Sequence, residues 1–218
     1  MDSIHNDFFA GRNVLVTGAS GLAGAHVLKK LLKTGAHIRA TYYRKLPVIN
    51  DCNIEYMRVN LTQEEDCARV VRGMDYVFMC AANTSGATVI EETPLVHVTP
   101  TVIMAAWMLD AAYKAGVQKF LWISSTVVYP VADYPIKEEE ATGEVFHKYF
   151  FAGETRRFIE KLCEMYAVHI KNSPMQVIVL RPSNFYGKYA NFDLRESHVI
   201  PALIRNVVER CDPIVIYG

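Results

Sequence analysis

Three glycines, Gly18, Gly21 and Gly24, recur at intervals of three residues between an apolar run and a helical pattern. Residues 13–18 are predicted to form a strand and its turn, and the apolar spacing after Gly21 is helical. In such a loop the first glycine permits a sharp turn, the second lets the backbone approach a pyrophosphate, and the third lets helix and strand pack closely. Amide groups and the dipole at the helix start attract phosphates. The loop predicts a dinucleotide site; the alternative is a turn that needs glycine only for its conformation.

The residues after the second predicted strand bear on which dinucleotide binds. An acidic residue there accepts hydrogen bonds from the ribose hydroxyls of NAD, whereas a basic residue pairs with the additional phosphate of NADP. Residues 40–45 read ATYYRK, without an acid, and Arg44 offers a planar set of donors that suits a phosphate. We therefore predict NADP, with NAD as the alternative. The alternative is that Arg44 and Lys45 are only solvent-exposed charges on a loop.

Short β-branched runs alternate with helical patterns along the whole chain. Strands are predicted at residues 13–18, 37–43, 54–60, 74–82, 119–125, 176–182 and 214–217. Helices are predicted from the glycine loop to Gly35 and at 62–71, 99–115, 153–168 and 198–210, with a capping box formed by Thr62 and Glu65. The alternation indicates an α/β fold, a Rossmann-type doubly wound parallel sheet with helices on both faces. Residues 1–182 are assigned to the dinucleotide-binding domain and residues 183–218 to the start of a small substrate-binding part.

The composition argues against several classes of protein. The 218 residues carry 23 basic and 23 acidic side chains, and a net charge of zero argues against a nucleic-acid partner. No uninterrupted apolar run is long enough to cross a bilayer, and the first residues lack the pattern of a signal peptide. Five cysteines without a C-x-x-C pair indicate reduced, buried thiols, and the scattered histidines predict no metal site. We expect a soluble cytoplasmic protein without a membrane partner, and the apolar ending DPIVIYG predicts a natural chain that continues past Gly218.

The G-x-x-G-x-x-G loop resembles that of the extended short-chain dehydrogenase/reductases, the NAD-dependent epimerase/dehydratase family, which act on nucleotide-sugars. Four further stretches resemble family motifs in the same order. They are Cys80-Ala81-Ala82 after the fourth strand, the Ser-Ser-x-x-x-Tyr signature at 124–129, the R-x-x-N-x-Y-G segment at 181–187, and Ser197-His198-Val199-Ile200-Pro201-Ala202-Leu203, which is similar to a helix of GDP-fucose synthases.

This resemblance implies a set of residues around the dinucleotide. Asn60 stands where the family has an aspartate that contacts the adenine, and an amide makes a similar contact. The implied cofactor-binding residues are Gly18, Ser20, Gly21, Leu22, Ala23, Gly24, Tyr43, Arg44, Asn60, Leu61, Cys80, Ala81, Ala82, Ser124 and Arg156.

The family's catalytic residues are a serine or threonine, a tyrosine and a lysine, and here the match is incomplete. Ser125 matches the serine; its alternative role is a strand-end hydroxyl that satisfies a backbone group. The tyrosine position falls on Ala152, which cannot transfer a proton, and the lysine position falls on Arg156, which keeps the charge in another geometry. Tyr149 lies one turn earlier and reaches the site only if the preceding loop rearranges. A core or surface role is the alternative for Tyr149.

His198 matches the histidine that GDP-fucose synthases pair with a cysteine for epimerisation. The cysteine position is Val127 here, so two-base epimerisation is not supported, and the alternative for His198 is a simple helix-start residue. The predicted catalytic residues are therefore Ser125, Tyr149, Arg156 and His198.

The resemblance implies an NAD(P)-dependent oxidoreductase, epimerase or dehydratase that acts on a nucleotide-sugar by hydride transfer. The alternative is a catalytically impaired dinucleotide-binding member with a regulatory or scaffold role. Family members commonly form homodimers through a four-helix bundle, and residues 99–115 and 153–168 match those helices. Met104, Trp107 and Met108 fit the core or that interface, and the core is the default.

Overall fold

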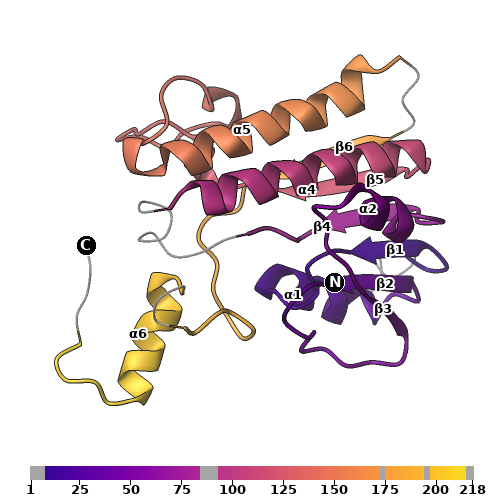
Figure 1. The fold of residues 1–218 in the computed structure, drawn as a ribbon. Coiled ribbons are helices and arrows are strands. Elements are labelled where there is room, and N and C mark those ends of the chain that lie inside the picture. Colours follow the sequence, from indigo (N-terminus) through magenta and orange to yellow (C-terminus); the bar gives the residue numbers. More distant parts are fainter. Residues whose placement is uncertain (1–7, 84–92, 172–174, 194–196, 215–218) are drawn as a thin grey trace.

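A six-stranded parallel sheet organises the chain, and the computed structural model describes residues 8–83, 93–171, 175–193 and 197–214 (Figure 1). The strand order is β3-β2-β1-β4-β5-β6. The strands are β1 (Asn13–Val16), β2 (His37–Tyr42), β3 (Ile54–Arg58), β4 (Tyr76–Met79), β5 (Lys119–Ile123) and β6 (Gln176–Leu180). The chain runs outward from β1 to β3 and then crosses to β4 on the other side of β1. This is the doubly wound order, and it places a ligand crevice at the carboxyl ends of β1 and β4.

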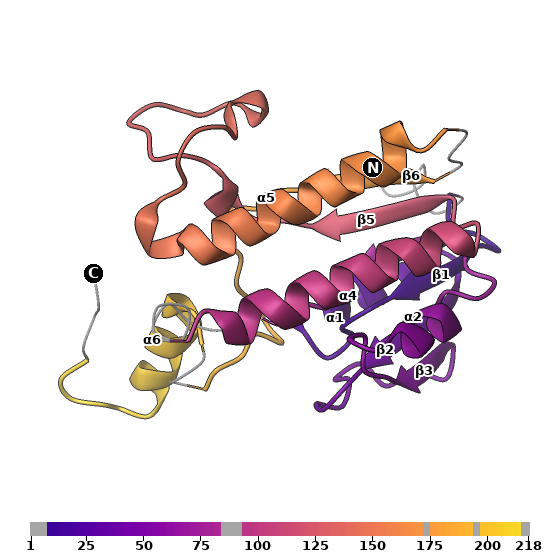
Figure 2. The same cartoon turned by 45° about the horizontal axis from the view of Figure 1, so that its top comes forward.

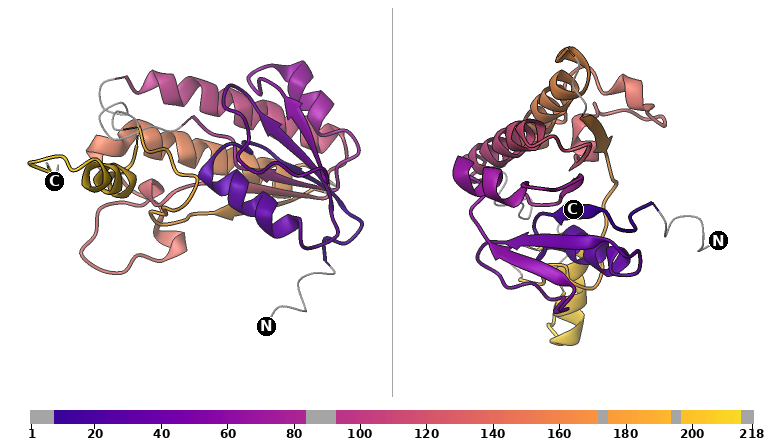
Figure 3. Two further views of the ribbon diagram at one scale, coloured as in Figure 1. Left: turned by 90° about the horizontal axis from the view of Figure 1, so that it is seen from below. Right: turned by 90° about the vertical axis from the view of Figure 1, so that its right-hand side faces the viewer.

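Helices cover both faces of this sheet, as predicted. They are α1 (Leu22–Leu31), α2 (Glu64–Val70), α4 (Leu95–Lys114), α5 (Phe150–Glu164) and the separate α6 (Val199–Val208). On one face Leu28 of α1 packs with Val14 and Ile38. On the other, Leu109 of α4 and Ile159 of α5 pack around Trp122. Figure 2 shows α4 and α5 side by side, and Figure 3 shows α1 on the opposite side of the sheet.

The helix α4 is long and apolar enough, by length and composition alone, to cross a membrane. Its apolar character has a structural explanation within this fold. Met108 and Leu109 of this helix are fully buried in the core. Met104 and Trp107, also on the helix, are partly buried against the same cluster. The default prediction places Met104, Trp107 and Met108 in the core. This prediction is confirmed for Met108, which is fully buried.

Three local predictions were wrong or incomplete. The capping box does not form: α2 begins after Gln63, and the Thr62 hydroxyl donates to Asn60 Oδ1 at 2.8 Å. The prediction of buried thiols fails for Cys52 and Cys211, which are exposed. The helix predicted at 153–168 begins three residues earlier and ends in a π-helical turn at 165–169. The predicted strand at 214–217 lies almost entirely outside the described residues.

Candidate dinucleotide and catalytic site

The three glycines of the loop have three different structural roles. Gly18 adopts a φ of +68°, and a Cβ there would lie 2.8 Å from the backbone of Ala81. A Cβ on Gly24 would lie 2.3 Å from the carbonyl oxygen of Gly18, so only glycine fits at this helix–strand contact. Gly21 is exposed, and the nearest atom to a Cβ there is 3.4 Å away. The turn and packing roles of the first and third glycines are confirmed, and a Cβ on Gly21 would meet the Gly18 carbonyl oxygen only at van der Waals distance.

The amino end of α1 has the properties of an anion site. Its N-cap residue is Gly21, and no side chain caps the helix. The amide groups of the first helical turn lack intrahelical acceptors, so they and the helix dipole are available to a phosphate. This end of α1 adjoins the carboxyl ends of β1 and β4, where the sheet order reverses. A pyrophosphate therefore fits the residues that are present.

Hydrogen bonds hold the neighbouring loops against the glycine loop. The Ala19 amide donates to the Thr41 carbonyl oxygen at 2.8 Å, and the Ser20 hydroxyl donates to the Lys45 carbonyl oxygen. On the β4 side, the Ala81 amide donates to Thr17 Oγ1 at 3.0 Å. Ser20 and Ala81, both predicted to contact the cofactor, thus lie at the margins of one site.

Two neighbouring residues predicted to bind the cofactor, Asn60 and Leu61, have side chains that are engaged elsewhere. Asn60 Oδ1 accepts hydrogen bonds from the amide and the hydroxyl of Thr62, which turns the Asn60 oxygen toward the start of α2. The Leu61 side chain is buried in the core. Contact between Leu61 and a nucleotide would therefore come from its backbone.

Cys80 closes the side of the glycine loop next to β4. The backbone of Cys80 and Ala81 lies directly against Gly18. Burial raises the pKa of the Cys80 thiol to about 12, so this thiol stays protonated near neutral pH. Cys80 acts as a wall of the site and not as a nucleophile.

The two serines at the carboxyl end of β5 have different partners. Ser124 is buried and its hydroxyl donates to the carboxylate of Glu160 on α5. Ser125 is half-buried, and its hydroxyl accepts from the Val127 amide at 3.4 Å at the start of a short 3₁₀ turn. The strand-end role considered for Ser125 is therefore present, through a long hydrogen bond that leaves its hydroxyl able to donate to another group.

Arg156 lies beneath the same strand end. Its guanidinium stacks over the Trp122 ring at 5.2 Å from the centroid, and Nη1 donates to the Ile123 carbonyl oxygen at 2.6 Å. Burial lowers the pKa of Arg156, and the nearby Glu160 carboxylate acts in the opposite direction. The structure thus places the predicted cation close to the serine segment, though its donors are partly used by the protein itself.

The start of α5 packs tightly on the turn that follows Ser125. A Cβ on Gly153 would lie 2.7 Å from the Val127 carbonyl oxygen, so the helix backbone touches this turn directly. Ala152 precedes Gly153 and offers only a methyl group. Tyr149 is the N-cap residue of α5, and its ring contacts Phe146 at 5.8 Å between centroids. In the described part of the chain, no hydrogen bond connects Tyr149 with Ser125 or Arg156.

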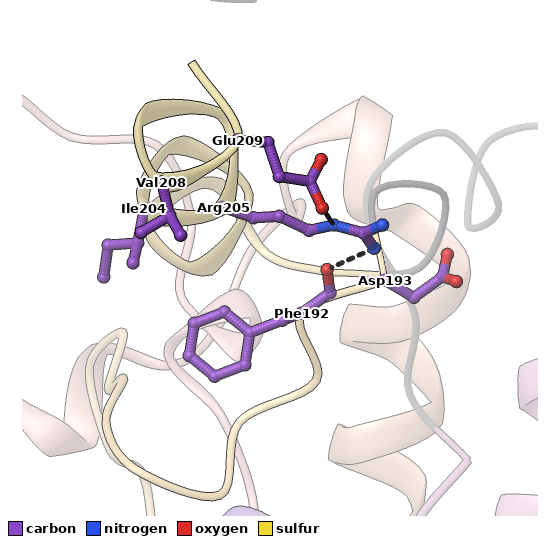
Figure 4. A pocket seen from close by; sticks show the side chains of 6 residues that line it. All are labelled: Phe192, Asp193, Ile204, Arg205, Val208 and Glu209. Carbon is purple, nitrogen blue, oxygen red and sulfur yellow. Dashed lines mark hydrogen bonds and ion pairs between the residues drawn. The ribbon is translucent and has the colours of Figure 1, made fainter. Parts of the chain in front are cut away.

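His198 is the N-cap residue of α6 and is exposed. Figure 4 shows a hollow on this helix, beside the salt bridge of 2.8 Å between Arg205 and Glu209. None of its lining residues belongs to the glycine loop or to the end of β5. They are Phe192, Asp193, Ile204, Arg205, Val208 and Glu209.

An ion pair that the sequence analysis missed connects four segments below the site. Arg181 at the end of β6 contacts Glu160 on α5 through Nη2 at 2.7 Å and Nε at 3.1 Å. The same arginine donates to the Tyr129 hydroxyl at 3.2 Å and to the Glu138 carbonyl oxygen at 2.8 Å. Because Glu160 also accepts from Ser124, this carboxylate holds α5, β5 and β6 together. No local sequence pattern connects Glu160 with Arg181, which is 21 residues away on another element.

Replacing Glu160 with glutamine is expected to lower the free energy of unfolding by about 1–3 kcal/mol, because it leaves the partly buried guanidinium of Arg181 without its anion. Urea unfolding followed by circular dichroism measures the change. The matched control is Glu164→Gln on the same helix, an exposed carboxylate paired with Lys161, which should leave the midpoint unchanged. Equal shifts for the two variants would contradict the special role of Glu160.

Fold and loop together define a dinucleotide-binding α/β protein, and comparison with known proteins assigns the family. The model for the NAD dependent epimerase/dehydratase family matches residues 14–218. The chain therefore belongs to this family, and the resemblance inferred from its motifs is confirmed.

Individual relatives are similar over most of this chain. GDP-L-fucose synthase of Sinorhizobium fredii (strain NBRC 101917 / NGR234) is 29% identical and matches 91% of this chain and 60% of its own length. GDP-mannose 3,5-epimerase 1 of Oryza sativa subsp. japonica is 27% identical over 94% of this chain and 55% of its own length. The fold is like that of UDP-glucose 4-epimerase from Thermotoga maritima, solved with UDP-glucose, with a TM-score of 0.80, 24% identity, and coverage of 94% of this chain and 66% of that chain. This chain thus spans a little over half the length of the curated relatives.

Proposed function

We propose that this chain carries the dinucleotide-binding part of an NADP-dependent enzyme that acts on a nucleotide-linked sugar by hydride transfer. The outcome would be a reduction or oxidation, an epimerisation or a dehydration. The observation that carries the proposal is the uncapped start of α1 behind Gly21, at the switch point of the sheet. Arg44 and Lys45, with no acid beside them, favour NADP over NAD.

When bound, the nicotinamide ring supplies or accepts the hydride. The protein groups around it have separate roles. Amides of α1 bind the pyrophosphate, and the Cys80–Ala81 backbone forms one wall beside Gly18. Ser125 offers a hydroxyl to the reacting sugar oxygen, and Arg156 places a fixed positive charge beneath that strand end. Residues 183–218 would belong to the part of the protein that binds the nucleotide-sugar.

The proposal is tested by NADPH oxidation and NADP reduction with purified protein and a panel of GDP-, UDP- and dTDP-sugars. Turnover with at least one of them supports the proposal. Binding of NADPH without any turnover across the panel would instead support the second candidate.

That second candidate is a dinucleotide-binding protein with impaired catalysis, and Ala152 is the specific observation that favours it. A methyl group stands where the family has its proton donor, and Tyr149 makes no described hydrogen bond to Ser125. The decisive variant is Tyr149→Phe in a protein that turns over. Turnover itself would exclude the second candidate, and its loss in Tyr149→Phe would assign the proton donor to Tyr149.

We also propose that the chain forms a homodimer through α4 and α5. Phe151 and Phe158 on α5 and Met165 at the start of the following π-helical turn recur every seven residues and are 47%, 50% and 49% exposed, so they form one apolar stripe along these two elements. The two helices lie side by side (Figure 2). An apolar stripe of this kind is typical of a buried interface.

Phe158→Glu is expected to weaken dimerisation by on the order of a hundredfold, because each interface would then bury two carboxylates in place of two aromatic rings. Sedimentation velocity over a range of protein concentrations measures the dissociation. Val131→Glu, at an exposed apolar position in the loop after Tyr129, is the control and should leave the dimer intact. A monomeric natural protein at all concentrations would contradict the proposed dimer.

A further inference from the structure

A second arginine lies beside the loop that carries Arg44. Arg58 is the last residue of β3 and pairs in register with Tyr42 of β2. Its Nε donates to the carbonyl oxygen of Tyr43 at 3.2 Å. The guanidinium of Arg44 stacks over the ring of the same tyrosine at 5.2 Å from the centroid. Tyr43 thus has one guanidinium at its carbonyl oxygen and another over its ring.

This pair of arginines is fixed to the glycine loop. The Tyr43–Lys45 segment is joined to the loop by the hydrogen bond from the Ser20 hydroxyl to the Lys45 carbonyl oxygen. The Ala19 amide holds the end of β2 through the Thr41 carbonyl oxygen. The positions of Arg44 and Arg58 relative to α1 are therefore set by the protein before any ligand binds.

The positive charge at this edge of the sheet is uncompensated. Within the described ranges, Arg44, Lys45 and Arg58 form no salt bridge, and the terminal nitrogens of Arg58 make no hydrogen bond. Two carboxylates on β3 and α2 are paired with other arginines, Glu55 with Arg39 at 2.8 Å and Asp66 with Arg69 at 2.6 Å. Three cations without an anion form a site for a dianion, because their mutual repulsion is relieved when the dianion binds.

We infer that Arg58 is a specificity-determining residue, which binds the 2′-phosphate of the dinucleotide together with Arg44 and so selects NADP over NAD. The inference rests on the proposed dinucleotide binding. In this fold the adenosine ribose lies at the carboxyl end of β2, and β3 is its neighbour in the sheet. Because Nε of Arg58 is used by Tyr43, its two terminal nitrogens form the donor pair that faces the phosphate.

The test compares NADPH with NADH by calorimetry in the natural protein and in Arg58→Gln, Arg58→Lys and Arg72→Gln. Arg58→Gln should weaken the binding of NADPH by on the order of tenfold, the contribution of one charge-assisted hydrogen bond, and should leave the affinity for NADH within about twofold of the natural value. The affinity of Arg58→Lys for NADPH should lie between those of the natural protein and Arg58→Gln, because lysine keeps the charge without the paired donors. Arg72→Gln removes an equal charge in the turn after α2, where the Arg72 carbonyl oxygen accepts from Arg39 at 2.9 Å, and it should change neither affinity. The affinity for adenosine 2′,5′-bisphosphate should change in each variant as the affinity for NADPH does, and the affinity for ADP should change as that for NADH does.

The outcomes separate this inference from the proposed function. If Arg58→Gln changes NADPH and NADH equally, or changes neither, Arg58 has no role in selection even though the dinucleotide site exists. If the natural protein binds neither dinucleotide, the proposed function itself fails. Thermal unfolding of each variant confirms that the protein remains folded during the comparison.

Discussion

Changing Ala152 to tyrosine together with Arg156 to lysine is expected to raise turnover of a nucleotide-sugar by on the order of a hundredfold or more, the contribution of a positioned general acid. A methyl group transfers no proton, whereas a phenol next to a lysine does, because the cation lowers the pKa of the phenol toward neutrality. Both substituted positions already lie next to the strand end that carries Ser125. Gly153 already lies against the turn after Ser125, and Arg156 already reaches the Ile123 carbonyl oxygen.

Single-turnover loss of NADPH absorbance measures this gain, with the natural protein and the double variant compared at saturating substrate. Ala152→Phe with Arg156→Lys is the matched control, because it adds the same ring without the hydroxyl. An equal gain in this control would show that ring packing and not proton transfer limits the natural chain. No gain in the tyrosine variant, with NADPH binding intact, would contradict the assignment of Ala152 to the proton-donor position.

Gly24→Ala is expected to abolish dinucleotide binding and to lower the free energy of unfolding by about 1–3 kcal/mol, the usual cost of overpacking. The added Cβ would lie 2.3 Å from the Gly18 carbonyl oxygen, so α1 must move away from the loop that it completes. Gly21→Ala is the matched comparison, because it separates an effect on binding from an effect on stability. Its Cβ meets protein only at 3.4 Å, so folding should be unchanged while the space for the pyrophosphate is reduced.

Thermal unfolding and calorimetry with NADPH distinguish these two effects. We expect Gly24→Ala to lose both stability and binding, and Gly21→Ala to lose about tenfold or more in affinity at unchanged stability. If Gly21→Ala binds NADPH as well as the natural chain does, the pyrophosphate does not lie at the start of α1.

The features that local sequence determines were predictable. Gly18 and Gly24 have φ and packing requirements that only glycine meets, and the spacing of the loop revealed both. The parallel sheet with helices on both faces follows from the alternation of strands and helices, because parallel strands need crossover connections. The family assignment followed from motifs in the same order along the chain.

Features that depend on contacts across the fold were not predictable. Ser124 was expected to face the dinucleotide, yet its hydroxyl donates to Glu160, which is 36 residues away in the sequence. The Glu160–Arg181 pair connects residues 21 apart on different elements, and no local pattern marks it. In both cases a polar group has a partner that only the packing of α5 against the sheet supplies. Asn60 differs, because its side-chain oxygen is held locally by Thr62, and this hydrogen bond replaces the predicted capping box.

Calorimetric titration of the natural protein with NADPH and with NADH tests the central claim most directly. We expect one molecule of NADPH per chain, bound about tenfold or more tightly than NADH, through the α1 amides and the cations after β2. Absence of binding for both dinucleotides at millimolar concentration, with the protein folded, would contradict the assignment of this loop as a dinucleotide site.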